Sequence, residues 1–194
     1  ILEARLAQLS PESRDLARIA AVIGRAFDAA VLAQVSEHSE DRLVQGLDDL
    51  WQQGIIREQG FNRLGVEAYD FNHDKIREVA YSGLSSIRRR MLHRRVAEAL
   101  EALHATELDE VSHQIALHYE QAGIAIKAIR AYQRAAQVAH RLGAVQEAIA
   151  FLTQAQTLLQ PLPENSARTG LALALQIDLG PLLLATKGYA APEV

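Results

Sequence analysis

Residues 69–81 constrain the fold most strongly, because a strand pattern passes directly into a helix pattern within this stretch. Phe71 and His73 are two residues apart and therefore share one face of an extended strand. Ile76 and Ala80 then follow at helical spacing. The pattern predicts that His73 lies where the strand ends and the helix begins, so that its imidazole can point at a neighbouring surface.

Helix signals precede this junction. Ser10 and Pro11 are typical of an N-cap followed by a proline in the first turn, and Gly24 is typical of a helix end. The pattern then predicts a short helix after Asp28, a helix over 39–53, and strands over 55–59 and 66–71. Three helices followed by a two-stranded hairpin is the order of a winged-helix domain, to which we assign residues 1–84.

The rest of the chain, residues 85–194, has a helical pattern throughout, interrupted at Gly123, Gly143 and Pro161. A small–large–small spacing occurs twice: in Ala128, Tyr132 and Ala135, and in Ala148, Leu152 and Ala155. This spacing is typical of the second helix of a tetratricopeptide repeat (TPR). We therefore expect a mainly α protein, in which a winged helix with a small two-stranded β wing precedes TPR-like antiparallel helices, the start of a longer repeat array.

The composition excludes several classes of function. The 194 residues carry a net charge of −4 and contain no cysteine, which excludes disulfides and thiol catalysis and favours a cytoplasmic location. No uninterrupted apolar run approaches the ~20 residues of a membrane span, so no membrane association is expected. No phosphate-binding Gly-rich loop and no metal-ligand spacing are present, so we expect neither catalysis nor a metal or cofactor in this chain. The first residue is Ile, which favours a piece of a longer protein.

Three blocks together resemble the STAND class of signalling ATPases, especially the bacterial regulators related to MalT, the LuxR-type ATPase regulators and the ATPase modules fused to kinases or cyclases. The blocks are residues 9–27, 71–81 and 89–97. The resemblance covers nearly the whole chain. It implies a P-loop ATPase core upstream, which binds ATP or ADP, then a winged helix and a helical-repeat arm.

Within this resemblance, His73 and Asp74 are similar to the His-Asp pair of the MHD motif, whose histidine meets the β-phosphate of ADP. This implies that His73 and Asp74 form an ADP sensor together with the upstream core. The sequence departs from the motif at Asn72, which stands where the motif has a hydrophobic residue. The alternative is that His73 only caps a helix or packs at the wing.

A basic run on the helix after residue 85 is a candidate surface for an acidic partner or another domain. Its candidate partner-binding residues are Arg88, Arg89, Arg90, Arg94 and Arg95. The alternative is a solvated face with some arginines paired to nearby glutamates. DNA is not expected as a partner of the winged helix, because residues 37–49 hold five acidic side chains against Arg42 alone.

These observations predict a non-enzymatic regulatory segment of a STAND ATPase. The winged helix would couple the nucleotide state of the upstream core to a protein or small-molecule inducer bound on the helical arm. The alternative is a free-standing TPR-like adaptor with a structural winged helix. The last helix carries more leucines than one neighbour can bury, so we expect residues 171–185 to be partly uncovered and to allow self-association.

Overall fold

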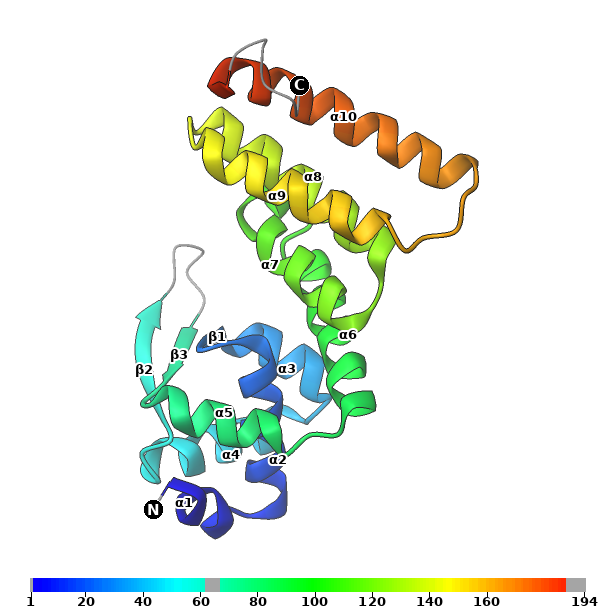
Figure 1. Ribbon diagram of the computed structural model, residues 1–194. Helices are drawn as coiled ribbons and strands as arrows, with labels where there is room; N and C mark the ends of the chain where they lie inside the picture. The colour runs from blue at the N-terminus through cyan, green and yellow to red at the C-terminus, as the bar shows by residue number, and fades with distance from the viewer. Residues whose placement is uncertain (1, 62–66, 188–194) are drawn as a thin grey trace. The chain divides into compact units, whose positions relative to one another are not determined.

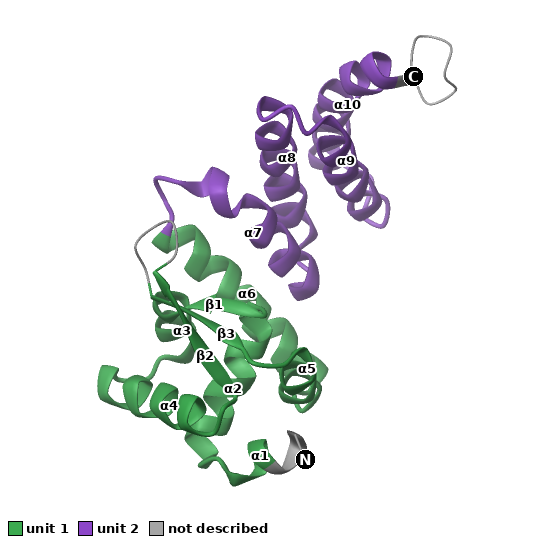
Figure 2. Cartoon of the chain, turned by 90° about the vertical axis from the view of Figure 1, so that its left-hand side faces the viewer, with its two compact units in different colours: residues 1–103 green, residues 104–194 purple. Residues whose placement is uncertain are grey.

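The computed structural model describes residues 2–61 and 67–187, which are mainly helical with one small antiparallel sheet (Figure 1). The chain forms two compact units, residues 1–103 and 104–194 (Figure 2). The sequence pattern predicts this boundary at residue 84 instead. The helix Ser86–Leu103 belongs to the first unit because it packs against two earlier helices of that unit.

The elements of unit 1 follow the predicted order, with two additions. They are α1 (Leu2–Gln8), α2 (Pro11–Ile23), β1 (Ala26–Asp28), α3 (Ala29–Ser36), α4 (Glu40–Gln52), β2 (Ile56–Phe61), β3 (Glu67–Phe71), α5 (Asp74–Ser82) and α6 (Ser86–Leu103). The additions are α1 and β1. Both are short, so neither carries enough residues for a clear hydrophobic period.

Unit 2 consists of helices in its described part. They are α7 (Leu108–Ala122), α8 (Ala125–Arg141), α9 (Val145–Leu159) and α10 (Ser166–Lys187). Each helix packs against the next along the chain. Gly123 and Gly143 have φ values of 78° and 77°, which favour glycine and allow the tight turns before α8 and α9.

The sheet has three strands in the order β1-β3-β2, all antiparallel, where a two-stranded wing was expected. Phe27 on β1 pairs with Tyr69, and its ring stacks on the Tyr69 ring with centroids 5.8 Å apart. Phe27 also lies 5.8 Å from the Phe71 ring, and both phenylalanines are buried. The burial of these rings explains why so short a strand stays on the sheet.

The core of unit 1 lies between the helices and one face of the sheet. Ser10 caps α2, since its hydroxyl accepts a 3.0 Å hydrogen bond from the Ser13 amide. Helix α2 is the central helix of the unit, because it packs against α3, α4, α5 and α6. Its apolar face is fully buried, with Leu16, Ala17 and Ala20 among the least exposed residues.

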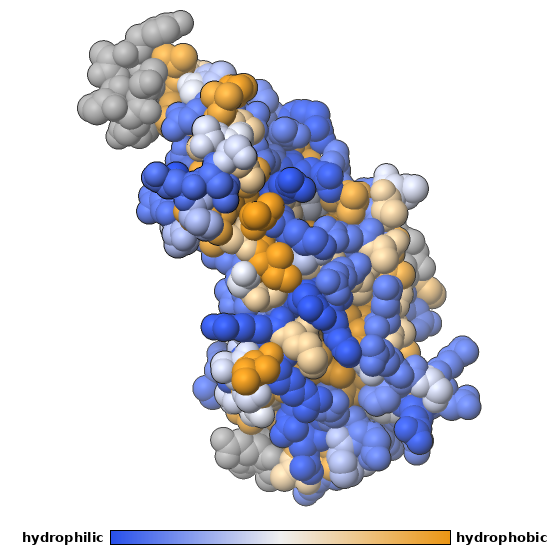
Figure 3. Space-filling view, turned by 90° about the vertical axis from the view of Figure 1, so that its right-hand side faces the viewer, coloured by the Kyte–Doolittle hydropathy of each residue, from blue (hydrophilic) through white to orange (hydrophobic). Residues whose placement is uncertain are grey.

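In α6, the stripe of apolar residues at helical spacing is only partly buried. Leu92, Val96, Ala99 and Leu100 are in the core, whereas three other members of the stripe are exposed: Ile87, Met91 and Leu103. Apolar side chains reach the surface elsewhere as well, scattered among polar ones on the face drawn in Figure 3.

In unit 2, all six residues of the two small–large–small patterns are buried, as their spacing predicts. A polar network joins the first three helices. Glu120 on α7 accepts a 2.6 Å hydrogen bond from the Tyr132 hydroxyl on α8 and another of 2.6 Å from the Gln154 amide on α9. Burial, and next the hydrogen bond to Glu120, raise the pKa of Tyr132, so its hydroxyl stays a donor.

Helix α10 continues through Pro181. Leu175, Leu179, Leu182 and Leu183 are buried, but Leu173 and Ile177 are 62% and 63% exposed. The prediction that this helix is partly uncovered is therefore confirmed. Among the described residues, α10 is also the one helix long and apolar enough to cross a membrane by length and composition, a test that core helices of soluble proteins pass too.

Candidate functional site

The junction between β3 and α5 is the candidate site. His73 is the N-cap of α5 and has an extended backbone, with φ −143° and ψ 132°. Its carbonyl oxygen accepts the first hydrogen bonds of the helix, from the amides of Ile76 (3.0 Å) and Arg77 (3.4 Å). The strand therefore passes into the helix at His73, as the sequence predicts.

The backbone on both sides of His73 is held firmly. Phe71 and Ile76 are fully buried, one before and one after the histidine. The Phe71 amide donates to the carbonyl of Arg25 at 3.0 Å, and the Asn72 amide donates to the carbonyl of Ile55 at 3.0 Å. These contacts fix where the His73 side chain leaves the backbone.

The His73 side chain itself is exposed, and it makes no cap hydrogen bond to α5. No hydrogen bond or ion pair joins its imidazole to any residue in the described part of the chain. His73 therefore caps α5 through its backbone, as the alternative predicts, while its side chain takes no part in the cap. Both ring nitrogens remain available to an outside group.

A group of four charged residues lies beside His73. Asp70, on β3, is buried, and its Oδ2 accepts hydrogen bonds from Arg57 (2.8 Å) and Gln59 (3.1 Å). The Nε of Arg25 lies 3.4 Å from the other oxygen, Oδ1, as an ion pair without hydrogen-bond geometry. Arg25 also donates from Nη1 to Asp74 at 3.0 Å.

This group connects three elements. Arg25 follows α2 and contacts one carboxylate on β3 and one on α5. The two arginines and two aspartates cancel in charge, so the surface beside His73 carries no net charge from them. Asp74 is engaged by Arg25 and is half exposed, so any contact of Asp74 with a ligand competes with this ion pair.

The sequence pattern pointed to His73 and Asp74 but not to Arg25 or Asp70. Asp70 could have been noticed in the sequence, because it is a charged residue on a predicted strand next to the apolar Phe71. Arg25 carries no such signal, because its ion-pair partners lie far away in the sequence. Asp70, the nearer of them, is 45 residues later.

The basic run on α6 is largely engaged within unit 1. Arg88 donates two hydrogen bonds to Asp15, at 2.6 and 2.8 Å, and Arg95 pairs with Glu37 at 3.3 Å. Arg94 pairs with Glu98 at 3.7 Å. Arg89 donates to the carbonyl of Ser82 at 3.0 Å, with its guanidinium carbon 4.7 Å from the centre of the Tyr81 ring.

Arg90 is exposed and has no hydrogen bond or ion pair to the described residues. Of the five arginines selected from the sequence, it is therefore the one whose charge is fully available to a partner. The five do not converge on a common point, and each of the other four has its own partner in unit 1.

No group of three or more His, Asp or Glu side chains in the described ranges is arranged to hold a metal ion. His93 is buried and hydrogen-bonded to the Tyr81 hydroxyl at 3.0 Å. Burial, and to a lesser degree the charge of Arg89, lower the pKa of His93 to about 4. His93 is therefore neutral in the folded protein at physiological pH.

Comparison with known proteins gives one relative. An uncharacterized protein of Rhizobium meliloti (strain 1021) is 30% identical over 192 residues, which cover 98% of this chain and 18% of that protein. The chain thus spans less than a fifth of the length of this relative. No family profile matches the chain, and no solved structure matches it.

Proposed function

We propose that this chain is a non-enzymatic regulatory segment of a multidomain STAND ATPase, in which unit 1 is a winged-helix domain and unit 2 is a TPR-like arm. In this proposal an upstream ATPase core binds ATP or ADP, and unit 1 reports which nucleotide is present. The observation that carries the proposal is the exposed imidazole of His73 on a fixed backbone at the start of α5.

The order of elements in unit 1 supports the winged-helix assignment. Helices α2, α3 and α4 precede the antiparallel pair β2 and β3, and the short strand β1 completes the sheet. Helix α4 has the position of a recognition helix, yet its first turn carries Glu40 and Asp41. Phosphate contacts require the opposite charge, so we propose a domain that contacts protein and nucleotide, not DNA.

The packing of unit 2 supports the TPR-like assignment. Consecutive helices pack in chain order, and alanines at the buried positions let neighbouring helices approach closely. We propose that this arm receives the inducer, a protein or a small molecule. The chain matches only 18% of the length of the Rhizobium relative. This supports the idea that such a segment occurs within a much larger protein.

The role of His73 can be tested in the full-length protein. His73→Ala should lower the affinity for ADP by about 10- to 150-fold, because a charge-assisted hydrogen bond to a phosphate is lost. Bound ADP is measured after purification, and its dissociation is followed with a fluorescent analogue. His140→Ala, which changes an exposed histidine at the end of α8, is the matched control and should leave ADP binding unchanged. Unchanged ADP affinity and basal output in His73→Ala would show that the sensor proposal is wrong.

The alternative function, a free-standing adaptor that binds a peptide on its helices, is favoured by the exposed Leu173 and Ile177 on α10. The two proposals differ in one readily measured respect. A P-loop in the full-length sequence upstream of this segment supports the STAND assignment, whereas its absence leaves only the adaptor.

A further inference from the structure

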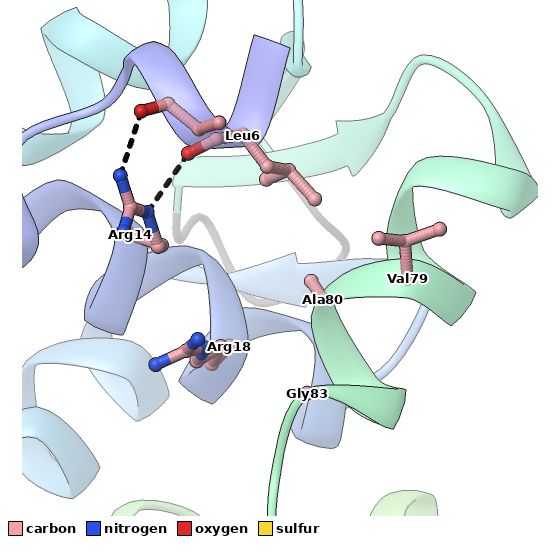
Figure 4. Close-up of a pocket in the computed structure, with 7 residues that line it drawn as sticks. Leu6, Arg14, Arg18, Val79, Ala80 and Gly83 are labelled. Carbon is pink, nitrogen blue, oxygen red and sulfur yellow. Dashed lines mark hydrogen bonds between the residues drawn. The ribbon is translucent and has the colours of Figure 1, made fainter. Parts of the chain in front are cut away.

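A cavity of about 250 Å³ lies within unit 1, between α1, α2 and α5. Figure 4 shows that Leu6 comes from α1, Arg14 and Arg18 from α2, and Val79, Ala80 and Gly83 from α5 or its end. Apart from the two arginines, the lining is apolar or glycine. None of the lining residues is acidic, so nothing in the wall neutralises the two positive charges.

Arg14 is engaged by backbone oxygens through Nε and Nη2. Its guanidinium donates to the carbonyls of Leu6 (2.9 Å), Ala7 (2.7 Å) and Leu9 (3.0 Å). These contacts fix the end of α1 against α2 and shape one wall of the cavity. The partners are neutral, so the charge of Arg14 is hydrogen-bonded but not cancelled.

Arg18 is different, because it is half-buried and makes no hydrogen bond or ion pair with the residues that the structure describes. The nearest carboxylate along α2, that of Asp15, is held by Arg88 through two hydrogen bonds. No Arg18 nitrogen is among the fully buried unpartnered atoms of the described residues, so the guanidinium still contacts solvent and can accept an anionic partner.

The missing side chain of Gly83 leaves space next to this guanidinium. A Cβ placed on Gly83 would lie 3.5 Å from Nε and 3.6 Å from Nη2 of Arg18. Gly83 has φ −69° and ψ −2°, which any residue adopts, so backbone strain does not require glycine here. Gly83 is exposed, so the space beside this edge of Arg18 lies at the surface of the unit.

We propose that this cavity binds a small aliphatic carboxylate, with the carboxylate on Arg18 beside Gly83 and the aliphatic part against Leu6, Val79 and Ala80. A planar guanidinium matches the two oxygens of a carboxylate. The apolar wall favours a ligand with a hydrocarbon part over a bare inorganic anion. The volume is below the 300–1,000 Å³ that is usual for ligand pockets, so the ligand has only a few carbon atoms. This inference does not depend on the proposed function.

The test is a titration of the ¹⁵N-labelled 194-residue chain, followed by NMR, with four probes: acetate, butyrate, butyramide and inorganic phosphate. Butyrate should give saturable shifts at the Arg18 side chain and at the amides of Ala80 and Gly83. Acetate should bind more weakly, because it lacks the hydrocarbon part, and butyramide should not bind, because it lacks the charge. Phosphate should produce only small changes that do not saturate.

Three variants complete the test. Arg18→Gln should weaken butyrate binding by about 10- to 100-fold, since the charged donor is lost. Gly83→Ala should also weaken it at least several-fold, because the new methyl group covers the Nε edge of Arg18 at ordinary contact distance. Arg42→Gln removes an equal charge from an exposed site on α4 of the same unit, which has no hydrogen bond or ion pair among the described residues, and should leave binding unchanged.

The proposal is overturned if butyrate gives no saturable response, if butyramide or phosphate binds as well as butyrate, or if Arg18→Gln binds like the unchanged chain. Far-UV circular dichroism and the urea midpoint of each variant show whether it is folded. A Gly83→Ala chain that is folded and binds butyrate with unchanged affinity also contradicts the proposed position of the carboxylate.

Discussion

The side-chain amide of Asn72 donates a 2.8 Å hydrogen bond to the carbonyl oxygen of Gly54, in the turn that follows α4. Asn72 immediately precedes His73, so this hydrogen bond connects the candidate sensor position to the turn before β2. In the proposed likeness to the MHD motif, a hydrophobic residue stands at this position. Here the Asn72 side chain donates to the Gly54 carbonyl, and a hydrophobic residue would leave that carbonyl without this donor.

The first prediction concerns this hydrogen bond. Asn72→Ala should lower the free energy of unfolding by about 1–3 kcal/mol, because the carbonyl of Gly54 loses its donor. Urea unfolding followed by circular dichroism measures the change. His73→Ala is the control, since its exposed side chain makes no hydrogen bond to the described residues, and it should change stability by less than about 0.5 kcal/mol. Equal effects of the two substitutions would contradict the role of Asn72.

The second prediction concerns pH. The folded protein keeps His93 neutral down to a pKa of about 4, whereas the unfolded chain binds a proton below the ordinary value of 6.5. The unfolded state therefore binds more protons between these values, and stability falls as pH is lowered from about 6.5 to about 4, by roughly 2–4 kcal/mol in all.

His93→Gln isolates this contribution, because glutamine can still contact the Tyr81 hydroxyl but does not titrate. The free energy of unfolding of His93→Gln should depend less on pH between about 4 and 6.5 than that of the unchanged chain. Parallel pH profiles for the two proteins would show that His93 is not the group responsible.

The third prediction concerns Glu120 in unit 2. Glu120→Ala should lower the stability of the chain by about 1–3 kcal/mol, because it leaves the buried Tyr132 hydroxyl without its acceptor. Tyr132→Phe removes that hydroxyl, so adding Glu120→Ala to Tyr132→Phe should cost less than Glu120→Ala alone. A double-mutant cycle from thermal or urea unfolding measures the coupling. Strictly additive effects would show that the hydrogen bond contributes little.

The fourth prediction concerns self-association through α10. Leu173 and Ile177 are four residues apart and both exposed, so they form an uncovered apolar face. Replacing both by Gln should leave the fold intact and shift any dimer toward monomer in sedimentation velocity. Leu175→Gln is the contrasting variant, because Leu175 is fully buried and its replacement should destabilise the unit. A monomeric unchanged chain at all concentrations would contradict this use of α10.

The sequence predicted the long helices and the strand-to-helix junction well, because Ile76, Val79 and Ala80, like Ala128, Ala131 and Tyr132, recur at i, i+3 and i+4. A helix brings all three such positions to one face, and a strand does not. It did not predict β1, whose three residues are stable through the ring contacts of Phe27 with residues more than 40 positions later. It also placed α6 with the later helices, because a helical stripe does not indicate which neighbour covers it.

The cavity next to Arg18 could not be predicted from the sequence either. Its walls come from α1, α2 and α5, which are brought together only by the tertiary fold. In the sequence, Arg18 is an ordinary charged residue on an amphipathic helix. Only the structure shows that Asp15, which could have paired with it, is held by Arg88.

The connections between consecutive helices of unit 2 differ in length. Single short turns at Gly123 and Gly143 join α7 to α8 and α8 to α9, whereas residues 160–165, with two prolines, join α9 to α10. Helix α10 packs mainly against α9, and only 22% of its apolar span is buried. Its detachment should therefore require less free energy than unfolding of the unit, and its amides should exchange with solvent deuterium before those of α8. An element that opens separately can be captured by a binding partner while the other helices of the arm remain folded.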